Sequence, residues 1–106
     1  MDTPKILRKD EALNLVRRYK DLIAPRFAPE TKVMMFGSYA KGYANPWSDI
    51  DVAVIVPKIE EGKWFDWAKS LCHDVDSVSL LIEPILLENG EDSPLYREVM
   101  RTGVAV

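Results

Sequence analysis

Hydrophobic and polar positions along this chain follow two different periods, which predict helices and strands in turn. Apolar side chains recur every three or four residues over Asp10–Ile23, as on one face of an amphipathic helix, and Pro25 ends that helix. The apolar run Lys32–Phe36 predicts a short strand. A second run, Asp49–Val56, is apolar on both faces and predicts an interior strand that ends at Pro57.

The second half of the chain continues this alternation of helix and strand. Glu61–Val75 predicts a helix and Val78–Leu87 a third strand. A last helix is predicted to begin at Pro94 and end at Gly103, before a short strand over Val104–Val106. The inner faces of the two helices are predicted to hold Phe65, Ala68, Leu71 and Cys72, and Leu95, Val99 and Met100. This order of elements predicts an α/β (α+β) fold, a short mixed sheet with helices packed on it, in one domain over residues 1–106.

A Gly-Ser step follows the first predicted strand. Ser38 is a natural N-cap, so a short helix is predicted to start there and run toward Tyr43. Backbone N–H groups at such a helix start favour a bound phosphate, which the chain can approach closely at Gly37. Lys41, one turn later, would reach the same anion. Taken alone, Gly-Ser is better explained by an ordinary strand-to-helix turn with a Ser cap, and only the acids ten residues later favour a phosphate site.

Two aspartates open the second predicted strand, where Asp has a low propensity. Asp49 and Asp51 would point to the same face, about 7 Å apart. Carboxylates this close repel one another unless a cation lies between them, and they are costly to bury unpaired. The alternative is a pair of surface acids at the start of an edge strand. The pattern therefore favours a divalent-metal site beside the phosphate turn, and hence chemistry on a nucleotide.

A third acid is expected from a neighbouring strand, because two-metal phosphoryl-transfer sites commonly use one. Glu83 is a single charge inside an apolar run, and Pro84 after it favours an extended conformation and an edge or bulged strand. Glu88 and Asp92, in the following turn, are weaker candidates. Alternatively, Glu83 simply faces solvent from that edge.

Aromatic residues flank the two aspartates, and the sequence leaves their role open. Tyr39, Tyr43 and Trp47 would either stack on a base or pack locally. Cys72 is predicted to be a small core residue, and His73 has no second His or Cys with which to complete a zinc site.

Composition narrows the function classes. Apolar residues make up 47% and charged residues 29%, as in ordinary soluble globular proteins, and no apolar run approaches the roughly 20 residues of a spanning helix. The polar residues 1–5 do not resemble a secretory signal, and a single cysteine fits a reducing, cytoplasmic environment. The net charge of −3 argues against extended nucleic-acid binding but not against a small anion that brings its own metal.

Two segments together resemble a known family: Gly37-Ser38-Tyr39-Ala40-Lys41-Gly42 and Ser48-Asp49-Ile50-Asp51-Val52-Ala53-Val54. They are similar to the Gly-Ser and Asp-x-Asp motif of the DNA polymerase beta-like nucleotidyltransferase superfamily, in particular its minimal (MNT-type) members. Ile82-Glu83-Pro84 and residues 96–103 resemble the closing strand and helix of that family. The resemblance implies a polymerase beta palm-like fold.

The resemblance also implies roles for individual residues. Gly37 and Ser38 would hold the triphosphate, with Lys41 at a position where relatives often carry Arg. Asp49 and Asp51 would bind two Mg²⁺ ions, for which Mn²⁺ could substitute. Glu83 would complete the site and assist deprotonation of the acceptor, although relatives more commonly carry Asp there.

The implied reaction is the Mg²⁺-dependent transfer of a nucleoside monophosphate, AMP in particular, from NTP (ATP) to an acceptor hydroxyl, with release of pyrophosphate. The implied partner is a helical HEPN-type protein, as in HEPN/MNT toxin–antitoxin pairs, or a second copy of the chain. The alternative is a catalytically weak or inactive protein of the same fold that acts by binding a partner, which the glutamate at position 83 would favour. A metal-dependent nuclease would leave the Gly-Ser turn without a task.

Overall fold

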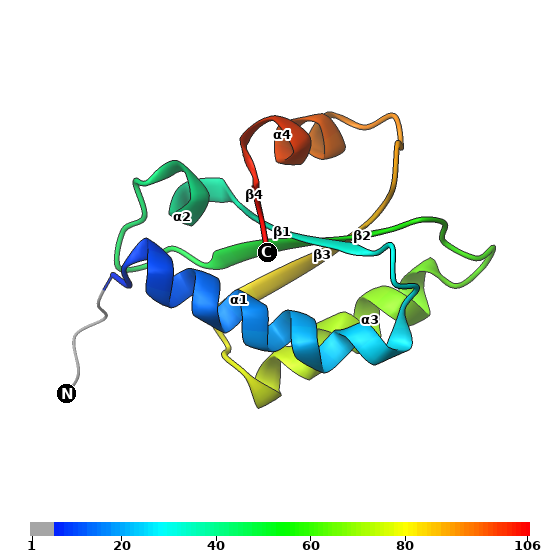
Figure 1. The fold of residues 1–106 in the computed structure, drawn as a ribbon, viewed down its shortest axis with the longest axis horizontal. Coiled ribbons are helices and arrows are strands. Elements are labelled where there is room, and N and C mark those ends of the chain that lie inside the picture. Colours follow the sequence, from blue (N-terminus) through cyan, green and yellow to red (C-terminus); the bar gives the residue numbers. More distant parts are fainter. Residues whose placement is uncertain (1–5) are drawn as a thin grey trace.

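The computed structural model describes residues 6–106 and shows a mixed four-stranded sheet with helices on both faces (Figure 1). The helices are α1 (Lys9–Ile23), α2 (Gly37–Lys41), α3 (Trp64–Asp74) and α4 (Pro94–Thr102), with short 3₁₀ turns at Ala24–Arg26 and Val75–Ser77. The strands are β1 (Lys32–Phe36), β2 (Ile50–Val56), β3 (Ile82–Glu88) and β4 (Val104–Ala105). The predicted fold class is confirmed. None of the described helices is long and apolar enough to cross a bilayer.

The strand order is β3-β2-β1-β4, so that β3 and β4 form the two edges. β2 runs parallel to β3 and antiparallel to β1. In this register Asp51 lies between Phe36 of β1 and Glu83 of β3. The end of β1 and the beginnings of β2 and β3 therefore meet at one end of the sheet, where all the candidate site residues lie.

Both faces of the sheet are covered, which explains why β2 is apolar throughout. α1 and α3 lie on one face and α4 lies on the other (Figure 1). Because side chains alternate along a strand, each face contributes every second residue. The first face packs Met35, Val52, Val54 and Leu86 against Val16 and Leu71, and the second packs Met34, Ala53, Ile55 and Leu87 against Val99.

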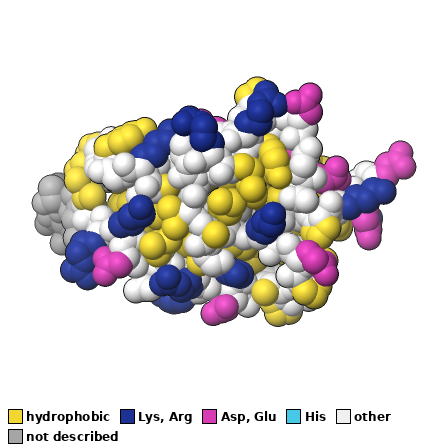
Figure 2. Space-filling view, turned by 45° about the horizontal axis from the view of Figure 1, so that its top comes forward, with side chains coloured by type: hydrophobic (Ala, Val, Ile, Leu, Met, Phe, Trp, Pro, Cys, Tyr) yellow, Lys and Arg dark blue, Asp and Glu magenta, His cyan; other side chains and the backbone are white. Residues whose placement is uncertain are grey.

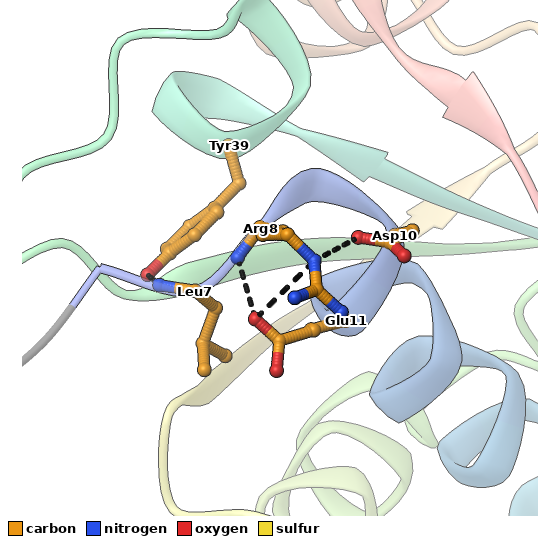
Figure 3. Close-up of polar contacts among 5 residues, drawn as sticks. All are labelled: Leu7, Arg8, Asp10, Glu11 and Tyr39. Carbon is orange, nitrogen blue, oxygen red and sulfur yellow. Dashed lines mark hydrogen bonds and ion pairs between the residues drawn. The ribbon is translucent and has the colours of Figure 1, made fainter.

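Tyr39 ties α2 to the start of α1. Its buried hydroxyl accepts a hydrogen bond from the backbone N–H of Leu7 at 3.3 Å (Figure 3). The first turn of α1 is closed by Glu11, whose Oε1 accepts from the N–H of Arg8 at 2.9 Å (Figure 3). The position of α2 at the end of the sheet is therefore set partly by α1.

Several predicted element starts are wrong. Helix α3 begins at Trp64, not Glu61, and β2 begins at Ile50, not Asp49. Ser38 is not an N-cap: α2 begins one residue earlier, at Gly37 with φ +74°, and Phe36 is its cap. The third strand begins at Ile82, not Val78. Ser79 causes that delay, because its N–H, Oγ and C=O are used in local turns to Val75, Leu81 and Ile82.

The predicted inner faces of α3 and α4 are also partly wrong. Phe65 is 68% exposed and Cys72 is exposed, whereas Trp67 is turned inward by an edge-to-face contact with Phe27 at 5.8 Å. On α4, Leu95 and Met100 are each about two-fifths exposed. On this helix, Val99 is buried against the sheet and Tyr96 packs beside it.

Other predicted features are confirmed. β1 has the predicted bounds, and β3, which carries Pro84, is an edge strand. Gly42 ends α2 in a left-handed conformation with φ +87°. The terminal strand β4 forms and pairs antiparallel with β1.

Candidate functional site

The carboxylate of Asp51 lies against the backbone of Gly37. A Cβ atom built on Gly37 would overlap Oδ2 of Asp51 and lie 3.1 Å from its Cγ. The register explains this contact, because Asp51 pairs with Phe36, the residue directly before Gly37. The Gly-Ser turn and strand β2 are thus in direct contact. Residue 37 must be glycine because the Asp51 carboxylate occupies the space of a side chain there.

Glu83 lies beside the two aspartates. It is the register partner of Asp51 on β3, so both side chains leave the same face of the sheet. Its carboxyl group is within hydrogen-bonding reach of Asp49, which lies directly before β2. Ile50 fixes this end of the β2–β3 ladder, since its N–H donates to the carbonyl of Leu81 at 2.7 Å. Three acids that are up to 34 positions apart in the sequence therefore lie together at one end of the sheet.

The clustering of like charges alters the titration of these groups. The pKa of Glu83 is raised first by its hydrogen bond with Asp49, then by desolvation and by the charges of both aspartates. The pKa of Asp51 is raised mainly by desolvation and then by the charge of Asp49. Ionising this cluster is therefore unfavourable without a counter-ion.

The chemistry of the donor set fits Mg²⁺ or Mn²⁺, which prefer carboxylate oxygens. Asp49, Asp51 and Glu83 are the residues that could hold such an ion. Within residues 6–106, however, no three His, Cys, Asp or Glu side chains are arranged as a preformed metal-binding group. The Asp51 carboxylate lies against Gly37, so side-chain rotation would have to bring the three carboxylates onto one ion.

Lys41 ends α2 and forms an ion pair that the sequence did not suggest. Its Nζ lies 2.8 Å from Oε1 of Glu98 on α4, and each side chain is about a third exposed. Arg101 binds the other oxygen of Glu98 at 2.5 Å. The paired cations lower the pKa of Glu98, with Lys41 contributing first. Lys41 and Glu98 are 57 residues apart in the sequence, and no motif links them.

Ser38 lies in the first turn of α2 and is partly buried. Its carbonyl oxygen accepts the N–H groups of Gly42 at 3.0 Å and Tyr43 at 3.1 Å. Among residues 6–106, its hydroxyl makes no protein hydrogen bond, so this group can bind a ligand oxygen.

Trp47 is presented to solvent by a closely hydrogen-bonded turn. Its N–H donates to Oδ1 of Asn45 at 2.8 Å, and the N–H of Asn45 donates to Oγ of Ser48 at 2.9 Å. The indole is 79% exposed although it lies only two residues before Asp49. Local packing therefore does not explain Trp47, whereas Tyr39 is buried and serves the fold.

A separate cavity of about 780 Å³ lies where β2 ends, at the opposite end of the sheet from the acids. Phe27, Ile59 and Trp67 are among its lining residues, and none of the candidate site residues line it. The candidate site is thus an open surface at one sheet end and does not coincide with this cavity.

Comparison with known proteins identifies the family. The family model described as a nucleotidyltransferase domain matches residues 16–98, which include both the Gly-Ser step and all three acids. The chain belongs to the nucleotidyltransferase domain family. The enzyme class expected from the sequence is confirmed at the level of this family. No curated protein matches the chain.

Solved structures resemble this nucleotidyltransferase domain to different degrees. A candidate nucleotidyltransferase from Sulfolobus solfataricus is 25% identical with a TM-score of 0.60, over 98% of this chain and 90% of that one. A toxin–antitoxin structure with AMP-PNP is 22% identical with a TM-score of 0.48, over 93% and 72%. A complex of tri-AMPylated Shewanella oneidensis HEPN toxin with MNT antitoxin is 20% identical with a TM-score of 0.43, over 92% and 67%. The last two TM-scores are too low to transfer any function to this chain.

Proposed function

We propose that this nucleotidyltransferase domain transfers a nucleoside monophosphate, AMP in particular, from ATP to an acceptor hydroxyl and releases pyrophosphate. The observation that supports this proposal is the contact between the Asp51 carboxylate and Gly37. It brings a backbone suited to phosphate oxygens next to acids suited to a divalent cation. A nucleoside triphosphate with its metal is the substrate class that requires both.

Individual residues have separate roles in this proposal. The backbone at Gly37 and the Ser38 hydroxyl bind the triphosphate, and Asp49 and Asp51 hold Mg²⁺, two ions in the complete site, with Mn²⁺ as a substitute. When bound, the metal neutralises charge on the triphosphate and on the departing pyrophosphate. Glu83, which lies beside both aspartates, completes the site and accepts the proton of the acceptor hydroxyl.

The acceptor in this proposal is a hydroxyl on a helical HEPN-type partner protein, to which the domain acts as antitoxin. The resemblance of the Gly-Ser and Asp-x-Asp segments to minimal nucleotidyltransferases supports this choice. A second copy of the chain is the competing acceptor, and the transfer assay separates the two by the mass of the labelled product.

The test incubates the purified chain with ATP labelled on the α-phosphate, with Mg²⁺, and with or without a HEPN-type partner. We expect label on the acceptor and an equal amount of pyrophosphate, both abolished by Asp49→Ala plus Asp51→Ala. Asp76→Ala, an exposed acid in the 3₁₀ turn after α3, is the matched control and should retain activity. ATP affinity that is unchanged in the double variant would contradict the site assignment.

A second candidate function is partner binding without catalysis. Two observations favour it: Lys41 is already paired with Glu98, and the three acids are not arranged as a preformed metal-binding group. This candidate predicts a stable partner complex with neither label transfer nor pyrophosphate release, and wild-type affinity for the partner in the Asp49→Ala plus Asp51→Ala variant.

A further inference from the structure

Cationic side chains from α1, α2, α4 and β1 lie around strand β4, at one edge of the sheet. Figure 2 shows this side of the molecule, with Lys and Arg side chains spaced around hydrophobic ones and most acidic groups toward the outline. We call the following five residues the basic rim: Lys9, Lys20, Lys32, Lys41 and Arg101.

Direct contacts connect the basic rim around β4. Lys9 Nζ donates to the carbonyl of Ala40, next to Lys41, at 3.1 Å. Lys41 and Arg101 share Glu98, and Arg101 lies three residues before β4.

The other two cations of the rim lie near the residue after β4. Lys20 Nζ donates to the backbone oxygen of Val106 at 2.6 Å. The N–H of Val106 donates to the carbonyl of Val33, the neighbour of Lys32, at 3.0 Å. Each of the five cations is therefore linked by contacts, or by its place in the chain, to β4 or to the segments beside it.

Most of this positive charge is uncompensated. Within residues 6–106, Lys9 and Lys32 form no ion pair with a carboxylate. The carbonyl contact of Lys9 neutralises no charge, whereas Lys20 contacts a terminal, negatively charged oxygen of Val106. Glu98 and this terminal group offset two of the five cations, which leaves +3 on the rim of a chain whose net charge is −3. Such segregation produces a local positive potential on an acidic protein.

The centre of this face is apolar. Leu13, Val104 and Val106 are only partly buried there and pack against the core from its outer side. Leu13 follows Lys9 by one helical turn and precedes Lys20 by two, so the three share one side of α1. β4 itself is an edge strand with a neighbour on one side only, and its outer backbone groups are available for pairing.

We infer that the basic rim and its apolar centre dock a protein whose contact surface has acidic residues around an apolar segment. An apolar centre with a charged border is the usual anatomy of a protein interface, and complementary charge speeds and orients docking. RNA fits less well, because Leu13, Val104 and Val106 include no aromatic ring on which a base could stack. This inference does not depend on the transfer reaction.

Fluorescence anisotropy of labelled probes tests this inference at 50 and 200 mM salt. The probes are an amphipathic Leu/Glu peptide, a Leu/Lys peptide of the same length, and a poly(A) oligonucleotide. The rim variant is Lys20→Glu plus Lys32→Glu. The control, Lys63→Glu plus Lys69→Glu, changes the net charge equally at exposed positions before and on α3. Lys32→Glu alone serves as a rim variant that leaves the Lys20 contact to Val106 intact, and thermal melting checks that each variant folds.

We expect the chain to bind the Leu/Glu peptide, more weakly at the higher salt. The rim variant should lose about tenfold in affinity, the single Lys32→Glu variant should lose less, and the control should match the wild type. Equal binding by the rim variant and the control, no binding of the Leu/Glu peptide, or tighter binding of poly(A) than of this peptide would overturn the inference. An inactive chain that binds the Leu/Glu peptide through the rim would refute the proposed reaction and leave this inference standing.

Discussion

The carboxylate of Asp51 occupies the space that a side chain at Gly37 would need. This relationship joins the turn after β1 to the acid of β2 and makes each residue depend on the other. Antiparallel pairing places Asp51 opposite Phe36, the last residue of β1. The chain turns from β1 into α2 at the next residue, Gly37, which therefore lies beside the Asp51 side chain. Any side chain introduced at position 37 must therefore displace the Asp51 carboxylate.

Gly37→Ala should therefore destabilise the fold and weaken nucleotide binding together. A left-handed φ costs an alanine about 1–2 kcal/mol, and displacement of Asp51 adds to that cost. Gly62→Ala is the control, since its φ of +78° is similar and nothing lies within 4 Å of the added Cβ. Urea denaturation of both variants measures the difference. Adding Asp51→Ala to Gly37→Ala should recover part of the stability, and equal losses in the two single variants would contradict the steric argument.

Asp51→Asn should stabilise the metal-free chain at pH 7. Since folding raises the pKa of Asp51 above its ordinary value of 3.8, the native state holds this proton more tightly than the unfolded state. Wild-type stability therefore falls as pH rises from that value through the raised one, and the penalty persists above it. The variant should therefore have a higher Tm than the wild type at pH 7, and the difference should shrink as the pH falls below 3.8.

The effect of Mg²⁺ on the Tm of the wild type and of Asp51→Asn tests whether Asp51 binds the metal. Mg²⁺ should raise the Tm of the wild type and have a smaller effect on Asp51→Asn. Asp76→Asn, which changes an exposed acid in the 3₁₀ turn after α3, should follow the wild type at every pH and Mg²⁺ concentration. A Tm for Asp51→Asn below that of the wild type at pH 7 without metal would show that the raised pKa has been misassigned.

Lys41→Gln and Glu98→Gln should have opposite effects on ATP affinity. Removing Lys41 deletes a cation one turn from the phosphate turn, whereas removing Glu98 releases that cation to the ligand. We expect a loss of about three- to tenfold in the first variant and a smaller gain in the second, measured by calorimetry at low salt. An equal loss in both would mean that the ion pair acts only by holding α2 against α4.

The pH dependence of stability also distinguishes these roles. Folding lowers the pKa of Glu98, chiefly through Lys41. Its contribution is therefore present above the ordinary glutamate pKa of 4.5 and is lost as pH falls through the lowered value. Glu98→Gln should reduce the Tm at pH 7 and leave it unchanged near pH 2.

Trp47→Ala should weaken nucleotide binding, while Trp47→Phe should largely preserve it. The indole is 79% exposed on a rigid turn beside Asp49, and base–aromatic stacking contributes about 1–3 kcal/mol. Trp64→Ala, which removes a 52% exposed indole from the start of α3, is the control. Titration with ATP and Mg²⁺, followed by tryptophan fluorescence, measures both. Equal affinities of Trp47→Ala and Trp64→Ala would assign Trp47 to another surface role.

Most strands were predictable from the sequence, because a buried strand needs a continuous apolar run and β1 and β2 have one. Helix faces were less predictable. Trp67 packs inward because its ring contacts that of Phe27, from a distant segment. Phe65 and Cys72 are exposed. The sequence shows which residues of a helix are apolar, but the segments that pack against the helix determine which of them are buried.

The candidate site divides in the same way. The family motif, the Gly-Ser turn and the acids at the start of an interior strand are visible in the sequence, since a strand buried on both faces admits few charges. Three features are not visible there: Glu83 lies beside Asp51, Lys41 pairs with Glu98, and Trp47 is exposed while Tyr39 is buried. Those outcomes depend on strand order, register and helix docking, which arise from contacts between residues far apart in the chain and leave no local pattern.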